Sequence, residues 1–138
     1  MLEYRIFYGV SMPEHFVALI KQYANLNNNE QARRVAEEIS EGLQLTLSED
    51  QSKLFFVYAP DYLEPKKSRF YSKMFDWNRP YQHMALIQRI KIMQNLTDDI
   101  EAENRLRAYF TAIKIVSSDK SFRNISSVLP AKLKSVLN

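Results

Sequence analysis

The chain has 138 residues, of which 46% are hydrophobic and 25% charged, and its net charge of +3 is small. This length and composition predict one helical domain over residues 1–138, and no apolar run approaches the ~18 residues of a membrane span. With only Gly9 and Gly42 the chain lacks a glycine-rich nucleotide loop, and without cysteine it lacks disulfides, thiolate metal sites and thiol nucleophiles.

The first 26 residues combine an alternating pattern with a helical one. Residues 2–8 alternate apolar and polar side chains, which indicates a short strand. Ser11, Pro13 and Glu14 then form a typical helix start, and apolar residues at helical spacing predict a helix over residues 12–26. The asparagine-rich residues 25–29 are expected to form a turn.

A second helix is predicted over residues 29–41, where the apolar residues form one stripe. Gly42 stands where a helix C-cap glycine is common. Residues 43–59 fit two structures, because alternating leucines suggest a hairpin whereas Ser48 and Gln51 form a capping-box pattern. We favour a helix over residues 49–59 that ends before Pro60.

Four further helical patterns follow. The first covers residues 65–77, and the second runs from a cap at Asn78 to about residue 95. The second is apolar around most of its circumference, which is typical of a central, buried helix. Thr97 is expected to cap the third, whose apolar stripe reaches Val116, and a last helix over residues 120–137 is interrupted near Pro130.

These patterns predict a mainly α fold in which six or seven helices form a single-domain bundle. A short N-terminal strand or a small hairpin fits the same sequence, so the alternative fold class is α+β. No internal repeat of fixed period is apparent. The N-terminus lacks the pattern of a signal peptide, and we therefore expect a cytoplasmic protein.

Charge is distributed unevenly along the chain. Residues 29–50 contain six acidic and two basic residues, whereas residues 101–138 contain three acidic and seven basic residues. Such an asymmetry can steer a charged partner toward one part of the surface, although it does not identify that partner.

The sequence offers little that could carry catalysis. Arg79 and His83 would suit an anion clamp and a general base, but a lone histidine without a fixed partner is more typical of a helix surface, and the same holds for His15. Asp98 and the acids that follow it could hold Mg²⁺, yet acids at a helix start are already explained by the helix dipole. We therefore expect no enzyme, no metal and no cofactor.

The segment over residues 66–81 interleaves basic and aromatic residues. Basic groups pair with phosphates and aromatic rings stack on bases, so this composition suits single-stranded nucleic acid. Core packing of Phe70, Met74 and Trp77 would explain the aromatic residues equally well. The candidate binding residues for a partner protein or a nucleic acid are Lys66, Lys67, Arg69, Tyr71, Lys73, Arg79 and Tyr81.

A second basic group could extend this surface. It consists of Arg105, Arg107, Lys114, Lys120 and Arg123. Glu103 stands four residues before Arg107 and is expected to pair with it, which would remove part of the group from the surface.

Eight tyrosines and five methionines are many for a small helical domain, and both residue types are enriched at protein interfaces. Four of the tyrosines lie between or near predicted helix ends, where burial is expected to be incomplete: Tyr58, Tyr62, Tyr71 and Tyr81. The leading prediction is a non-enzymatic protein–protein interaction module, such as an adaptor, regulator or inhibitor. The alternative is a basic nucleic-acid-binding accessory protein that uses residues 66–81.

Overall fold

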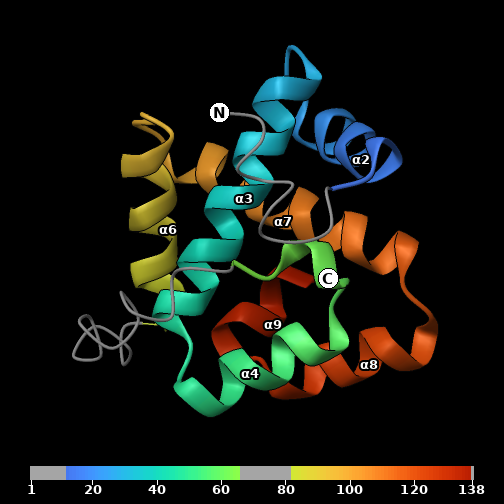
Figure 1. Cartoon of the computed structure of the whole chain (residues 1–138). Helices are drawn as coiled ribbons and strands as arrows, with labels where there is room; N and C mark the ends of the chain where they lie inside the picture. The colour runs from blue at the N-terminus through green and yellow to red at the C-terminus, as the bar shows by residue number, and fades with distance from the viewer. Residues whose placement is uncertain (1–11, 66–81, 138) are drawn as a thin grey trace.

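The structure is a computed structural model that describes residues 12–65 and 82–137, and this part of the chain is helical (Figure 1). Its helices are α2 (Glu14–Ala24), α3 (Asn29–Thr46), α4 (Glu49–Tyr58), the 3-10 turn η1 (Asp61–Leu63), α6 (Gln82–Met93), α7 (Asp99–Val116), α8 (Asp119–Val128) and α9 (Ala131–Leu137). Seven α-helices and no strand among these residues confirm the mainly α fold class. The strand predicted over 2–8, and all but the first residue of the helix predicted over 65–77, lie outside the described residues.

Residues 43–59 form the end of one helix and the whole of the next. Ser48 caps α4, because its Oγ accepts a hydrogen bond from Gln51 N at 3.1 Å while Ser48 N donates to Gln51 Oε1 at 3.3 Å. This capping box starts the helix, and Pro60 limits it at the other end. The predicted helix is confirmed and the hairpin alternative is wrong.

Gly42 lies inside α3, so the predicted C-cap at this position is wrong. An ideal Cβ built on Gly42 would lie only 2.7 Å from Cδ1 of Leu86 on α6. The missing side chain therefore allows α3 and α6 to pack closely, and α3 continues to Thr46.

The second half of the chain differs from its prediction at two places. α6 buries Leu86 and Ile90 but exposes Ile92 at 80%, so the prediction that this helix is buried all round is wrong in its last turn.

The start of α7 also differs from its prediction. Asp98 caps this helix, since its Oδ1 accepts a hydrogen bond from Ile100 N at 2.9 Å, and Thr97 does not cap it. The interruption predicted near Pro130 is confirmed as the break between α8 and α9.

The helices after α2 occur in two matching sets. α3 and α7 have 18 residues each, α4 and α8 have 10 each, and the bounds of both pairs differ by 70 residues. Ser48 and Ser118 cap α4 and α8, and Pro60 and Pro130 follow those helices at the same distance. Residues 13–63, the first repeat, and residues 83–133, the second repeat, therefore share one architecture. The interpretation that the chain lacks an internal repeat is wrong.

The turns that end α2 and α6 support this equivalence. Asn25 and Asn95 both have a positive φ, of 58° and 55°. In each turn the next residue, Leu26 or Leu96, donates its N–H to the carbonyl oxygen five residues earlier, at 2.9 and 2.8 Å. Both turns are Schellman motifs, in which asparagine tolerates the left-handed conformation better than most residues.

The two repeats are interleaved in space (Figure 1). α2 of the first repeat packs on α7 of the second, and α6 of the second packs on α3 of the first. α3 also contacts α7, and α4 contacts α8. This set of contacts is unchanged when the repeats are exchanged, so they are related by a pseudo-twofold axis and each completes the core of the other, as the subunits of a dimer do.

The core lies between the repeats and contains a polar contact. Ser40 on α3 and Tyr109 on α7 are both buried, and Ser40 Oγ lies 2.7 Å from Tyr109 Oη. Burial raises the pKa of Tyr109 well above its usual value, and the hydrogen bond with Ser40 offsets only part of this rise. The contact therefore joins α3 to α7 at a point where an unpaired hydroxyl would be costly.

Candidate interaction surfaces

The seven binding residues predicted between positions 66 and 81 all lie outside the described residues. They are Lys66, Lys67, Arg69, Tyr71, Lys73, Arg79 and Tyr81. His83 falls within α6, although its side chain is outside the described part, and His15 is exposed in the first turn of α2. These residues remain predictions, and the candidate surfaces below come from other parts of the chain.

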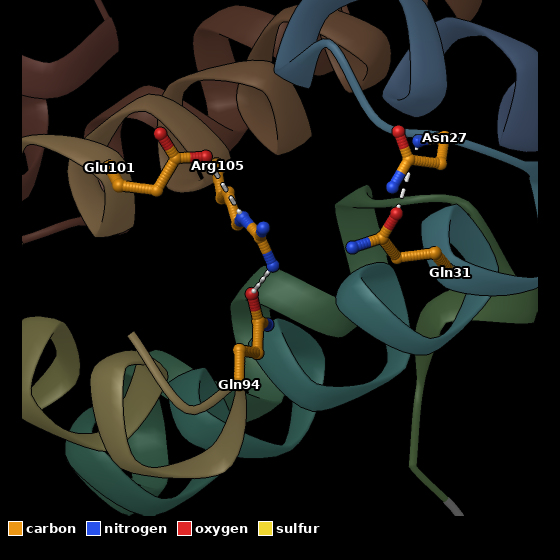
Figure 2. A network of polar contacts seen from close by, with 5 residues as sticks. All are labelled: Asn27, Gln31, Gln94, Glu101 and Arg105. Carbon is orange, nitrogen blue, oxygen red and sulfur yellow. Dashed lines mark hydrogen bonds and ion pairs between the residues drawn. The ribbon is translucent and has the colours of Figure 1, made fainter. Parts of the chain in front are cut away.

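The second basic group is smaller than predicted, because two of its arginines are engaged within the protein, and Figure 2 shows one of them, Arg105. Arg105 is buried, with Nη1 2.7 Å from Gln94 Oε1 and Nε 3.4 Å from Glu101 Oε2. Arg107 binds Glu103 at 3.0 Å, as predicted, and also donates to the carbonyl oxygen of Val136 at 3.0 Å. The exposed members that remain are Lys114, Lys120 and Arg123.

The acidic residues at the start of α7 all have structural partners. Asp98 caps the helix, and Asp99 Oδ1 lies 2.7 Å from Lys91 Nζ. Glu101 and Glu103 pair with the arginines one turn later. In residues 12–65 and 82–137, no group of three or more histidine, cysteine or acidic side chains is arranged to hold a metal ion.

A partly buried polar seam lies between α3, α6 and α7. Burial raises the pKa of Glu38 on α3, while the adjacent amide of Gln94 and the charge of Arg34 lower it part of the way. Burial also lowers the pKa of Arg89 on α6.

No helix in the described part of the chain combines the length and the apolar character that crossing a membrane requires. Several large apolar side chains are nevertheless exposed to solvent. Two lie on α4, at Leu54 (42%) and Val57 (71%), and three lie where α6 turns into α7, at Ile92 (80%), Met93 (37%) and Ile100 (69%). We refer to Ile92, Met93 and Ile100 as the apolar corner.

An ion pair holds the apolar corner together. Lys91 near the end of α6 and Asp99 at the start of α7 bind each other at 2.7 Å, and the corner isoleucines directly follow these two residues in the chain. The Schellman turn at Asn95 and the contact between Arg105 and Gln94 fix the connection between the helices. The corner is thus an apolar surface on a defined turn.

The first repeat shows that the fold does not require these isoleucines. Gln22 is equivalent to Ile92 and Glu30 is equivalent to Ile100, and all four residues are exposed. An exposed aliphatic side chain gains nothing from burial in the free protein, and a polar residue supports the same turn in the other repeat. The corner isoleucines therefore point to a role outside folding.

The tyrosines predicted to be partly exposed follow the prediction where they are described. Tyr58 and Tyr62 are half-buried, and Tyr62 packs edge-on against Phe16 with ring centroids 5.4 Å apart. Sequence reasoning missed the corner, because isoleucines near a helix end resemble core residues. Alignment of the two repeats would have exposed them as positions with polar counterparts.

The chain was compared with protein-family models, curated proteins and solved structures, and none of the three comparisons finds a match.

Proposed function

We propose that this chain is a non-enzymatic protein–protein interaction module of the cytoplasm that binds its partner through the apolar corner. The observation that carries the proposal is the exposure of Ile92 and Ile100, at 80% and 69%, on a turn held by the ion pair between Lys91 and Asp99. The ion pair joins the residues that directly precede the two isoleucines, and exposed apolar patches on protein surfaces are typical of interaction sites.

Two further observations support the proposal. The acids that sequence analysis considered for metal binding act as a helix cap and as ion-pair partners. The absence of cysteine suits a reducing compartment such as the cytoplasm. Burial of one isoleucine side chain on binding contributes about 1.5–3 kcal/mol, so two such side chains can dominate a modest interface.

The test replaces the corner isoleucines with the residues of the first repeat, as Ile92→Gln and Ile100→Glu together. The control variant combines Gln88→Ala with Asn104→Arg, which introduces first-repeat residues at two exposed polar positions of the same helices. Partners captured from an extract of the source organism are identified by mass spectrometry, purified and titrated by calorimetry against all three proteins. We expect the isoleucine variant to lose affinity at least about 100-fold and the control to retain it.

A partner that binds the isoleucine variant as tightly as the wild-type protein would remove the corner from the proposal. Far-UV circular dichroism and thermal unfolding of the variant must match the wild-type protein, so that lost binding is not lost folding.

Nucleic-acid binding through residues 66–81 remains the alternative function. It is supported by the exposed Lys114, Lys120 and Arg123, which leave part of the second basic group accessible. Fluorescence anisotropy with single-stranded DNA and RNA tests it. Binding that weakens steeply with salt, and is lost when Lys66, Lys67, Arg69 and Lys73 become glutamate, would favour this function over the first.

A further inference from the structure

The outward faces of α4 and α8 carry equivalent residues of different character. The stripe on α4 has the spacing i, i+3, i+4, i+7, which places its residues on one side of the helix, and α8 repeats it 70 residues later. The α4 stripe is Asp50, Lys53, Leu54 and Val57, and the α8 stripe is Lys120, Arg123, Asn124 and Ser127. α4 and α8 pack on each other along the lower edge of the molecule in Figure 1, and we call the two stripes together the α4–α8 face.

The chain segments that carry the two stripes have opposite net charge, although the α4 stripe itself is neutral because Lys53 balances Asp50. Residues 44–65 contain four acidic residues and one basic residue, whereas the equivalent residues 114–135 contain one acidic residue and five basic ones. The exposed Asp50 is the first residue of the α4 stripe, and the exposed Asp61 follows its other end. Lys120 and Lys132, also exposed, occupy the equivalent places around the α8 stripe, apart from the one-residue shift of Lys132. None of these four residues forms an ion pair with any residue in the described part of the chain.

Folding does not explain this difference. Asp50 in the first turn of α4 interacts favourably with the helix dipole, but Lys120 at the equivalent position of α8 opposes it. Leu54 and Val57 are exposed, at 42% and 71%, where α8 carries Asn124 and Ser127. The same helix is therefore built twice: the α4 stripe ends in exposed aliphatic residues and carries one acid and one base, whereas the α8 stripe ends in polar residues and carries two bases.

We propose that the α4–α8 face binds the same face of a second copy of this chain, with α4 of each copy against α8 of the other. A twofold arrangement of this kind pairs the acidic segment with the basic segment twice, and it covers Leu54 and Val57 in both copies. Because acids lie at or beyond both ends of the α4 stripe and bases at or beyond both ends of the α8 stripe, the charges match for either relative direction of the helices. The proposal is independent of the apolar corner, which lies on α6 and α7.

The resulting dimer is weak and sensitive to salt. A helix of 10 residues is only about 15 Å long, so the covered area is smaller than in a stable complex. Solvent-exposed charges are screened over ~10 Å at 0.1 M salt and over ~3 Å at 1 M salt, and self-association therefore decreases across this range.

Sedimentation equilibrium tests the proposal at protein concentrations up to roughly 1 mM. This range detects a dimer whose dissociation constant is as weak as roughly 1 mM. One variant combines Asp50→Lys with Asp61→Lys, so that its α4 segment becomes basic. The other combines Lys120→Glu with Lys132→Glu, so that its α8 segment becomes acidic. Each variant alone is expected to weaken dimerisation at least about tenfold, whereas their mixture restores both pairings and forms a heterodimer of wild-type strength.

A third variant, Leu54→Asn with Val57→Ser, introduces the second-repeat residues and leaves all charges in place. It is expected to weaken dimerisation as well, and it keeps the proposal testable if a charge variant folds poorly. A wild-type chain that stays monomeric at roughly 1 mM and low salt overturns the proposal, as does a dimer that none of the variants weakens. Loss of nucleic-acid binding by the Lys120→Glu, Lys132→Glu variant, with its self-association unchanged, would instead assign the basic half of the face to phosphates.

Discussion

The two repeats of this chain share their helix bounds and their turn geometry, and they differ at exposed positions. Ile20 and Ile90 are identical and fully buried, and the turns at Asn25 and Asn95 have the same geometry. The exposed Ile92, in contrast, corresponds to a glutamine. Residues that both repeats share at equivalent positions are those that the fold is expected to require, whereas an exposed apolar residue that only one repeat carries is not needed for the common architecture. Each repeat thus serves as an internal control for the other.

The largest expected effect tests whether the repeats form one folding unit. Ile20→Ala and Ile90→Ala should each lower the free energy of unfolding by about 2–5 kcal/mol, because both remove a fully buried side chain. Since α2 packs on α7 and α6 packs on α3, both variants should still unfold in one transition. Urea denaturation followed by far-UV circular dichroism measures both quantities. Two separate transitions would show that the repeats fold independently.

A smaller effect concerns a contact without a counterpart elsewhere in the repeats. Ser40→Ala should cost about 1–3 kcal/mol, because the buried hydroxyl of Tyr109 loses its partner at 2.7 Å. The double variant Ser40→Ala, Tyr109→Phe should recover part of this loss. Denaturation of the three variants gives the coupling energy, and strictly additive losses would argue against the hydrogen bond.

The raised pKa of Tyr109 makes the stability of the protein depend on pH. The pKa of Tyr109 is raised above the ordinary value of 10.0, so the phenol stays protonated in the folded protein at a pH where it ionises in the unfolded chain. The free energy of unfolding should therefore decrease as pH rises above 10, by about 1.4 kcal/mol per pH unit for one such group. Denaturation of Tyr109→Phe over the same range should give a shallower slope, and an unchanged slope would assign the effect to other tyrosines.

The smallest expected effect compares the two Schellman turns. Asn25→Ala and Asn95→Ala should each destabilise the protein by about 1 kcal/mol, because alanine is disfavoured at a positive φ of 58° or 55°. Glycine at either position should restore most of the loss. Thermal unfolding compares the variants, and a clear difference between the two positions would mean that the turns are not equivalent.

Most of the helices could be predicted from the sequence, because their signals are local. The Ser48 capping box settles α4, and Pro130 separates α8 from α9. The C-cap predicted at Gly42 was wrong, because a glycine near a helix end can either cap the helix or allow a neighbouring helix to pack closely. Only the short distance between Gly42 and Leu86 distinguishes the two roles. The cap predicted at Thr97 was wrong, because Thr97 and Asp98 can both cap a helix and the structure places Asp98 at the N-terminus of α7.

The repeat and the candidate surfaces could not be predicted in this way. Few residues are identical between residues 13–63 and 83–133, so the equivalence appears only when helix bounds and burial are compared. Arg105 was expected on a basic surface, but its guanidinium pairs with the carboxylate of Glu101 and donates a hydrogen bond to the amide oxygen of Gln94. Whether a side chain is exposed depends on which helices pack on its own helix, and these helices are far away in the sequence.

The packing of α2 on α7 also has a consequence for synthesis of the chain. α2 ends at Ala24, whereas α7 is complete only at Val116, about 90 residues later. At 5–20 residues per second, α2 waits roughly 5–20 seconds for the helix that covers it. During this interval the surface of α2 that α7 later covers has no partner from the second repeat. The first repeat therefore cannot complete its core until the second repeat has been synthesised.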